Sequence, residues 1–195
     1  MKIIGVIGGC GSGKSQVSQL LIDKFDAYVI NADEVSHEII RKGTKAYHEI
    51  VYFFGKKILD SEGNINRKTL GKIVFSDKIL LDKLTNITHP YINEEIIQLI
   101  STLKQNNQYK YIVVEITALG RGEIYNLIDE FWYIYCDIDV RLERLNKYRN
   151  MSKEKAMSII NKQWSNSEFE KFADIIINNS FTLDNTYQQI SKHLD

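Results

Sequence analysis

Short apolar runs alternate along this chain with longer segments in which apolar residues recur at helical spacing. Residues 2–7 (KIIGVI) are almost entirely apolar and predict a buried strand. In residues 14–25 (KSQVSQLLIDKF) the apolar positions recur every three or four residues, which predicts a helix. A second apolar run at residues 27–30 (AYVI) follows at once and predicts another strand. The chain therefore opens in the order strand, helix, strand.

The same alternation returns in the second half of the chain. Residues 109–116 (YKYIVVEI) and 131–137 (FWYIYCD) are rich in β-branched and aromatic side chains and predict two more strands. Residues 140–149 (VRLERLNKYR) predict the start of a helix, and residues 173–178 (ADIIIN) predict a short last strand before a C-terminal helix. Strands that alternate with helices indicate a parallel sheet with helices on both faces.

The middle of the chain, from residue 33 to about residue 105, is mostly helical in pattern. It is interrupted at residues 54–67 (FGKKILDSEGNINR), where glycines and other turn formers gather. This middle part is too long for a simple crossover between two strands. We therefore expect a subdomain beside the carboxyl edge of the sheet, where open α/β sheets bind ligands.

Composition and charge narrow the class of protein. The 195 residues are 44% apolar, which suits one globular domain with inserted subdomains. Lysine and arginine total 25, as do aspartate and glutamate, so no broad basic surface is expected for a nucleic-acid polymer or an anionic membrane. No apolar run reaches membrane-spanning length. Positive charge for phosphate recognition must therefore be local.

The two cysteines, Cys10 and Cys136, match no metal-binding or disulfide spacing. We expect free thiols, as is usual in a reducing compartment. The strand pattern begins at residue 2, so no signal peptide is expected. These features together predict a cytoplasmic protein.

Residues 8–15 (GGCGSGKS), named the phosphate loop below, match the pattern G-x-x-x-x-G-K-[ST] in full. They lie between a predicted strand and a predicted helix, which is the context that the pattern requires. Backbone N–H groups and the helix dipole would bind phosphates, Lys14 would add a full charge, and Ser15 would offer its hydroxyl to Mg²⁺. The alternative is a glycine-rich turn without a ligand. The expected nucleotide contacts are Gly9, Gly11, Ser12, Gly13, Lys14, Ser15 and Gln16.

A phosphate loop alone is compatible with a kinase, a hydrolysing motor or a GTP switch. The chain has no N-K-x-D tetrad for reading guanine, and it is short for a motor. A small-molecule kinase needs an acceptor-binding subdomain and a mobile segment that carries arginine. Both have candidates here, so this class is favoured.

The motifs that follow the phosphate loop, in their order and spacing, resemble those of the dephospho-coenzyme A kinase family. The matching stretches are 4–15 (IGVIGGCGSGKS), 31–34 (NADE), 54–77 (FGKKILDSEGNINRKTLGKIVFSD), His89-Pro90, 141–149 (RLERLNKYR), Gln163, Ala173-Asp174 and 178–180 (NNS). The resemblance covers residues 1 to about 180.

This resemblance implies ATP-dependent phosphorylation of the ribose 3′-hydroxyl of dephospho-coenzyme A. It also implies an α/β fold of the P-loop kinase type, with a five-stranded parallel sheet. The core would comprise residues 1–31, 91–137 and 171–195, the acceptor-binding part residues 32–90, and a lid residues 138–170. We expect a monomer or a weak homo-oligomer.

The resemblance also implies roles for individual residues, each with an alternative. Asp33 would be catalytic and contact the acceptor, or it would cap a helix. Glu115 would hold Mg²⁺ directly or through water, or it would be a strand-end carboxylate that faces solvent. Arg67 would bind an acceptor phosphate, or it would be an ordinary charge at a helix start. His89 would bind the acceptor, or it would be buried in a turn before Pro90.

The predicted lid helix carries three arginines. Arg144 and Arg149 would contact the nucleotide, with Arg149 also catalytic; the alternative is a solvated, salt-bridged helix face. Arg141 is assigned to that solvated face. In the closing stretch, Asn179 would contact the nucleotide.

The sequence departs from the family pattern at Asn31, Gln16, Arg121, Phe169 and Phe181. Two alternatives therefore stay open. One is a nucleoside or nucleotide kinase of the same fold, and the other is a non-catalytic nucleotide-binding relative.

Overall fold

The computed structural model describes residues 1–116 and 122–194. The chain divides into two compact units. The sheet unit comprises Met1–Asn31, Thr102–Arg121 and Tyr125–Asp195. The helical unit comprises Ala32–Ser101 and Gly122–Ile124.

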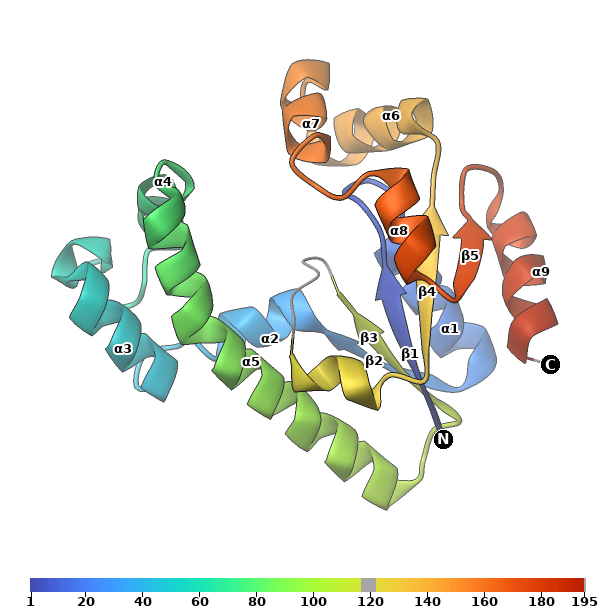
Figure 1. The fold of residues 1–195 in the computed structure, drawn as a ribbon, viewed down its shortest axis with the longest axis horizontal. Coiled ribbons are helices and arrows are strands. Elements are labelled where there is room, and N and C mark those ends of the chain that lie inside the picture. Colours follow the sequence, from blue (N-terminus) through green and yellow to red (C-terminus); the bar gives the residue numbers. More distant parts are fainter. Residues whose placement is uncertain (117–121, 195) are drawn as a thin grey trace. The chain divides into compact units, whose positions relative to one another are not determined.

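The sheet unit is built on a parallel sheet of five strands in the described part of the chain (Figure 1). The strands are β1 (Lys2–Ile7), β2 (Ala27–Asn31), β3 (Tyr111–Glu115), β4 (Glu130–Tyr135) and β5 (Ile175–Asn178), in the order β2-β3-β1-β4-β5. All five lie where apolar runs predicted strands. The register pairs Val6 with Glu115 of β3 and with Trp132 of β4. The end of β1, and so the start of the phosphate loop, therefore lies at the centre of the sheet's carboxyl edge.

Helices cover both faces of this sheet. Because side chains alternate along a strand, Ile4 and Val6 share one face, where they pack with α1 (Lys14–Phe25) and α9 (Leu183–Leu194). On β4, Tyr133 stacks on Phe169 of α8 (Asn166–Phe172), with ring centroids 4.9 Å apart. The predicted α/β fold with a parallel sheet is confirmed.

Three short helices follow β4. They are α6 (Ile138–Arg149), α7 (Lys153–Ile160) and α8. Asn150 ends α6 in the left-handed conformation, and its N–H donates to the carbonyl of Leu145. Ser152 caps α7, and a capping box of Ser165 and Glu168 begins α8. Figure 1 shows α6 and α7 beyond the carboxyl end of β4, on the side where the phosphate loop begins.

The helical unit has a hydrophobic core of its own. Its elements are α2 (Ala32–Glu38), α3 (Lys45–Phe54), the short 3₁₀ helix η1 (Lys56–Ile58), α4 (Arg67–Phe75) and most of α5 (Lys78–Asn106). The core includes Tyr47, Ile50, Phe54, Ile58, Leu70, Val74 and Ile87. The turn formers between α3 and α4 close a tight loop, where Leu59 and Ile65 pair and Gly63 has a φ of 81°. A further 3₁₀ helix, η2 (Glu123–Leu127), precedes β4. None of the described helices combines the length and the apolar character needed to cross a bilayer.

Candidate active site

The phosphate loop takes the backbone path that its glycines permit. Gly11 and Gly13 have φ angles of 80° and 89°, a region that side chains with a Cβ rarely adopt. A Cβ at Gly13 would also collide with Nδ2 of Asn179. No side chain caps the first turn of α1, so the positive end of its dipole is directed at the loop.

Lys14 is folded into the loop that precedes it. The side chain is buried, and its Nζ donates to the carbonyl of Gly8 at 2.9 Å. The ammonium group is therefore held inside the curl of the loop. In that place a full positive charge would stabilise phosphate oxygens bound by the loop.

We expect Lys14→Ala to lower turnover with ATP by about 10²–10³, the cost typical of losing one preorganised electrostatic contact. The Tm of the ligand-free protein should change little, because removing a buried charge relieves its desolvation cost as it breaks the bond to Gly8. Steady-state kinetics and thermal unfolding measure the two effects. Lys24→Ala, at an exposed position on the same helix, is the control. Unchanged turnover in Lys14→Ala would remove the loop from the reaction.

Glu115, which is buried, accepts hydrogen bonds from two serines of α1, of which Ser18 is buried and Ser15 is exposed. Its Oε1 accepts from Ser15 Oγ and its Oε2 from Ser18 Oγ, each at 3.0 Å. The residue is 5% exposed, so the alternative of a carboxylate that faces solvent is wrong. The register of β3 against β1 explains this, because it places Glu115 beside Val6, directly before the loop.

The Ser15 and Glu115 oxygens suit one kind of metal. Among the described residues no group of three or more His, Cys, Asp or Glu side chains is arranged to hold a metal ion. Mg²⁺ does not need such a group, because it takes one or two protein oxygens and completes its shell with waters and substrate phosphates. A hydroxyl and a carboxylate 3.0 Å apart beside a phosphate loop fit that pattern.

The back of the loop is held by Asn179 and Arg144. Asn179 is 1% exposed, and its Nδ2 donates to the carbonyl of Ser12 at 2.9 Å. Its Oδ1 accepts from Thr186 Oγ1 at 2.9 Å. Arg144 donates from Nη2 to the carbonyl of Asn179 at 2.9 Å and from Nη1 to that of Ser12 at 3.4 Å. Both residues therefore position the loop here, and their direct contact with a nucleotide stays a prediction.

Arg141 does not lie on a solvated helix face, so the prediction from the sequence is wrong here. The residue is 6% exposed, and its Nε donates to the carbonyl of Cys10 at 2.8 Å. The face of α6 that carries Arg141 is turned toward the loop. The sequence contains a signal for this, because the apolar residue Leu145 lies four residues later and so on the same helix face, and the structure buries both residues.

Arg149 and Gln16 are exposed near the loop. Arg149 is the last residue of α6, and its Nη1 lies 3.9 Å from Sγ of Cys10. Gln16 lies in the first turn of α1. Cys10 and Cys136 are free thiols, as predicted. The roles of Arg149 and Gln16 toward a nucleotide stay predictions.

The predicted acceptor residues Asp33, Arg67 and His89 all belong to the helical unit. Asp33 is exposed and lies inside the first turn of α2, which begins at Ala32, so it does not precede the helix as a cap would. Arg67 is exposed and is the first residue of α4, where Asn66 provides the cap. A cation at that end opposes the helix dipole, so the position does not stabilise the helix.

His89 lies within α5, which continues through Pro90. The alternative of a turn before Pro90 is therefore wrong. Proline inside a helix removes one backbone hydrogen bond, yet α5 runs on from Pro90 to Asn106. Partial burial lowers the pKa of His89, which favours the neutral form of its imidazole.

The positions that depart from the family pattern have different surroundings. Phe169 is buried and stacks on Tyr133, which explains an apolar residue there. Phe181 is 65% exposed, and nothing in the structure explains it. Asn31 ends β2. Arg121 lies outside the described residues.

Comparison with known proteins gives a consistent result. Residues 2–185 match the family model described as dephospho-CoA kinase. A curated dephospho-CoA kinase of Aquifex aeolicus is 39% identical over 98% of this chain and 95% of its own length. That of Carboxydothermus hydrogenoformans is 36% identical over 97% and 91%. The solved dephospho-CoA kinase of Campylobacter jejuni is 29% identical, covers 100% of this chain and 96% of its own, and has a TM-score of 0.70. The chain belongs to the dephospho-CoA kinase family.

Proposed function

We propose that this chain transfers the γ-phosphoryl group of ATP to the ribose 3′-hydroxyl of dephospho-coenzyme A, which gives coenzyme A in the last step of its biosynthesis. The observation that carries the proposal is a complete phosphate loop whose Lys14 and Ser15–Glu115 pair are already in place, in a chain that matches the family over nearly its full length. In the reaction the 3′ oxygen bonds to the γ-phosphorus, the bond from that phosphorus to the β–γ bridging oxygen breaks, and ADP leaves.

The donor side of the reaction belongs to the phosphate loop. The loop N–H groups and Lys14 bind the phosphates, and Gln16, Arg144, Arg149 and Asn179 complete the nucleotide site. Ser15 and Glu115 would hold Mg²⁺, Glu115 directly or through water. Mg²⁺ bound there supplies positive charge to the β- and γ-phosphate oxygens. Arg149 neutralises the charge that develops on the transferring group. Its side chain is exposed at the end of α6, so it is available for this role.

The acceptor side belongs to Asp33, Arg67 and His89. Asp33 accepts the proton that the ribose hydroxyl loses as the new bond forms. Arg67 binds an acceptor phosphate through paired hydrogen bonds. His89 contributes a hydrogen bond, and the burial that lowers its pKa favours the uncharged imidazole in that role.

We expect Arg67→Ala to raise the acceptor KM about tenfold or more, the size typical of losing a charged hydrogen bond. The KM for ATP should change much less. Steady-state kinetics with each substrate varied in turn measure both constants. Lys68→Ala, exposed on the same first turn, is the control. A change in the ATP constant alone would place Arg67 on the donor side.

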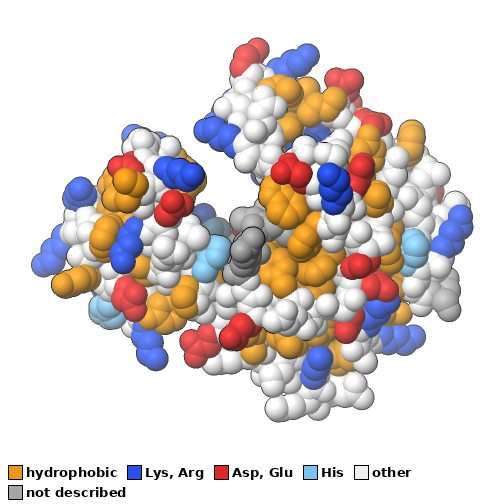
Figure 2. Space-filling model, viewed as in Figure 1, with side chains coloured by type: hydrophobic (Ala, Val, Ile, Leu, Met, Phe, Trp, Pro, Cys, Tyr) orange, Lys and Arg blue, Asp and Glu red, His pale blue; other side chains and the backbone are white. Residues whose placement is uncertain are grey.

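The composition supports the location and the kind of partner that we propose. The face in Figure 2 carries basic and acidic side chains interspersed, in keeping with a total of 25 of each kind in the sequence. We expect a cytoplasmic monomer or weak homo-oligomer that acts on small molecules. A nucleic-acid polymer or a membrane is not an expected partner.

An acceptor screen tests the proposed activity. The purified chain is incubated with ATP and Mg²⁺ and with dephospho-coenzyme A, nucleosides or nucleoside monophosphates, and ADP formation is measured. Turnover with dephospho-coenzyme A alone is expected. Turnover with a nucleoside or nucleotide instead would indicate the other kinase class, and none with any acceptor would indicate a non-catalytic nucleotide-binding relative.

A further inference from the structure

Arg141 carries a buried positive charge without an acidic partner. The residue is 6% exposed, and within the described part of the chain no carboxylate forms an ion pair with it. Burial lowers the pKa of its guanidinium, and the groups that oppose this shift are the Tyr133 phenol and the thiols of Cys10 and Cys136. A buried cation that nothing neutralises costs stability. Such a cost is offset where an anion binds beside it.

The guanidinium group lies directly against the phosphate loop. Its Nε donates to the carbonyl of Cys10 at 2.8 Å. A Cβ added at Gly9 would lie 2.8 Å from its Cζ and 3.2 Å from its Nη1, and would collide with its Nη2. Gly9 therefore lacks a side chain at the place where Arg141 approaches the loop backbone.

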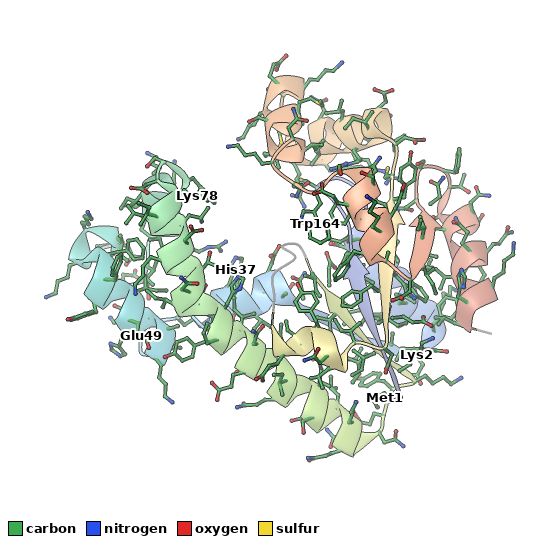
Figure 3. The ribbon with its side chains drawn as sticks, viewed as in Figure 1. Met1, Lys2, His37, Glu49, Lys78 and Trp164 are labelled. Carbon is green, nitrogen blue, oxygen red and sulfur yellow. The ribbon has the colours of Figure 1, made fainter. Side chains whose placement is uncertain are left out.

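Gln163 fixes this arrangement from a second direction. Its Oε1 accepts from the Cys10 N–H at 2.8 Å and from Arg141 Nη2 at 3.4 Å. The next residue, Trp164 (labelled in Figure 3), packs against Phe169 and Phe172 with centroid distances of 5.7 and 5.5 Å. Both polar groups of the Cys10 backbone are thus bound by side chains that are themselves held in place.

We propose that Arg141 is a phosphate-binding residue of this chain, which presents a fixed positive charge to the nucleotide phosphates at the Gly9–Cys10 side of the loop. The inference rests on the proposed use of ATP. The charge of Arg141 acts differently from that of Arg149, because Arg141 is buried and held in place before any ligand binds. It therefore acts on ATP affinity in the ground state, whereas Arg149 acts on kcat.

A competing explanation is a purely structural role, in which Arg141 and Gln163 only hold the Cys10 backbone in place. The two explanations predict different effects on ATP binding when a negative charge is placed beside Arg141. If Arg141 only braces the loop, a carboxylate in place of the Gln163 amide would preserve both hydrogen bonds and strengthen the brace. If its charge serves the phosphates, the same carboxylate would neutralise that charge and weaken ATP binding.

The first test is Arg141→Gln, with ATP and adenosine binding measured by calorimetry. We expect ATP affinity to fall about tenfold or more, and affinity for adenosine, which has no phosphate, to stay the same. The control is Arg41→Gln, at an exposed residue whose partner is Glu38 of the other unit. A folded Arg141→Gln protein with ATP affinity within about twofold of wild type would overturn the proposal.

The second test is Gln163→Glu, which remains informative if Arg141→Gln does not fold. We expect the Tm of the ligand-free protein to be equal or higher and ATP affinity to fall several-fold. Gln105→Glu, at an exposed position, controls for the added negative charge. Unchanged or tighter ATP binding by Gln163→Glu would overturn the proposal. Wild-type protein that bound no ATP would instead contradict the proposed function, so the two failures are distinguishable.

Discussion

Replacing Asp33 with asparagine is expected to lower kcat at least about a hundredfold, within the range of 10²–10⁴ typical of a general base. A ribose hydroxyl is a weak nucleophile, and its proton must leave as the bond to phosphorus forms. Asparagine keeps the size of aspartate, but its amide accepts no proton at neutral pH. Asp33 is exposed in the first turn of α2, so the substitution should preserve folding and ATP binding. Steady-state kinetics, ATP binding and thermal unfolding measure the three quantities.

Two neighbouring substitutions control the Asp33 experiment. Glu34→Gln removes a carboxylate from the same helical turn and should leave kcat nearly unchanged. Asn31→Asp adds a carboxylate at the end of β2 and should change the rate modestly or raise it. If Asp33→Asn keeps near-normal activity, Asp33 is only a favourable charge at a helix start. Glu115 would then be the next candidate for the base.

Removing Arg149 is expected to have the other large effect. Arginines that stabilise charge in phosphoryl transfer contribute about 10³–10⁵ in rate, so Arg149→Ala should lower kcat by about 10³ or more. Acceptor binding should remain nearly intact, because the side chain is exposed at the end of α6, on the loop side of the sheet unit. Single-turnover kinetics and acceptor titration separate the rate from the affinity.

Measuring the same kinetics in variants of Arg141 and Lys147 shows which result would contradict the prediction for Arg149. Lys147→Ala, also exposed in the last turn of α6, should leave kcat nearly unchanged. Arg141→Gln should weaken ATP binding and affect kcat much less than Arg149→Ala does. A loss of kcat at Arg141 with none at Arg149 would mean that the transition-state arginine has been wrongly identified.

Much of the sheet unit could be predicted from local patterns. Each strand is a short run of apolar or aromatic residues, and its length and β-branched or aromatic content distinguish it from the amphipathic helices between the strands. The phosphate loop was predictable because its glycines, Lys14 and Ser15 are close in sequence. Glu115 was predictable as a candidate because parallel strands end at one edge, but its burial depends on the pairing of β3 with β1.

The error at Arg141 concerns contacts with distant segments of the chain. Arg141 was assigned to solvent because charged helix faces usually are exposed, yet its partners are Cys10, 131 positions away, and Gln163. The sequence also does not reveal that the Asn179 side chain reaches Ser12, 167 positions away, although the predicted role of Asn179 is not contradicted. For His89 only the alternative of a turn before Pro90 is wrong, because α5 continues there, and its acceptor role stays a prediction. Neither periodicity nor motif spacing contains these long-range contacts.

Product analysis is the decisive experiment for the proposed phosphoryl transfer. The purified chain, ATP, Mg²⁺ and dephospho-coenzyme A are mixed, and the products are identified by mass spectrometry and phosphorus NMR. The proposed transfer predicts one ADP for each coenzyme A formed, with the new phosphate monoester on the ribose 3′ oxygen. ATP hydrolysis without transfer, transfer to another oxygen, or recovery of unchanged dephospho-coenzyme A would contradict it.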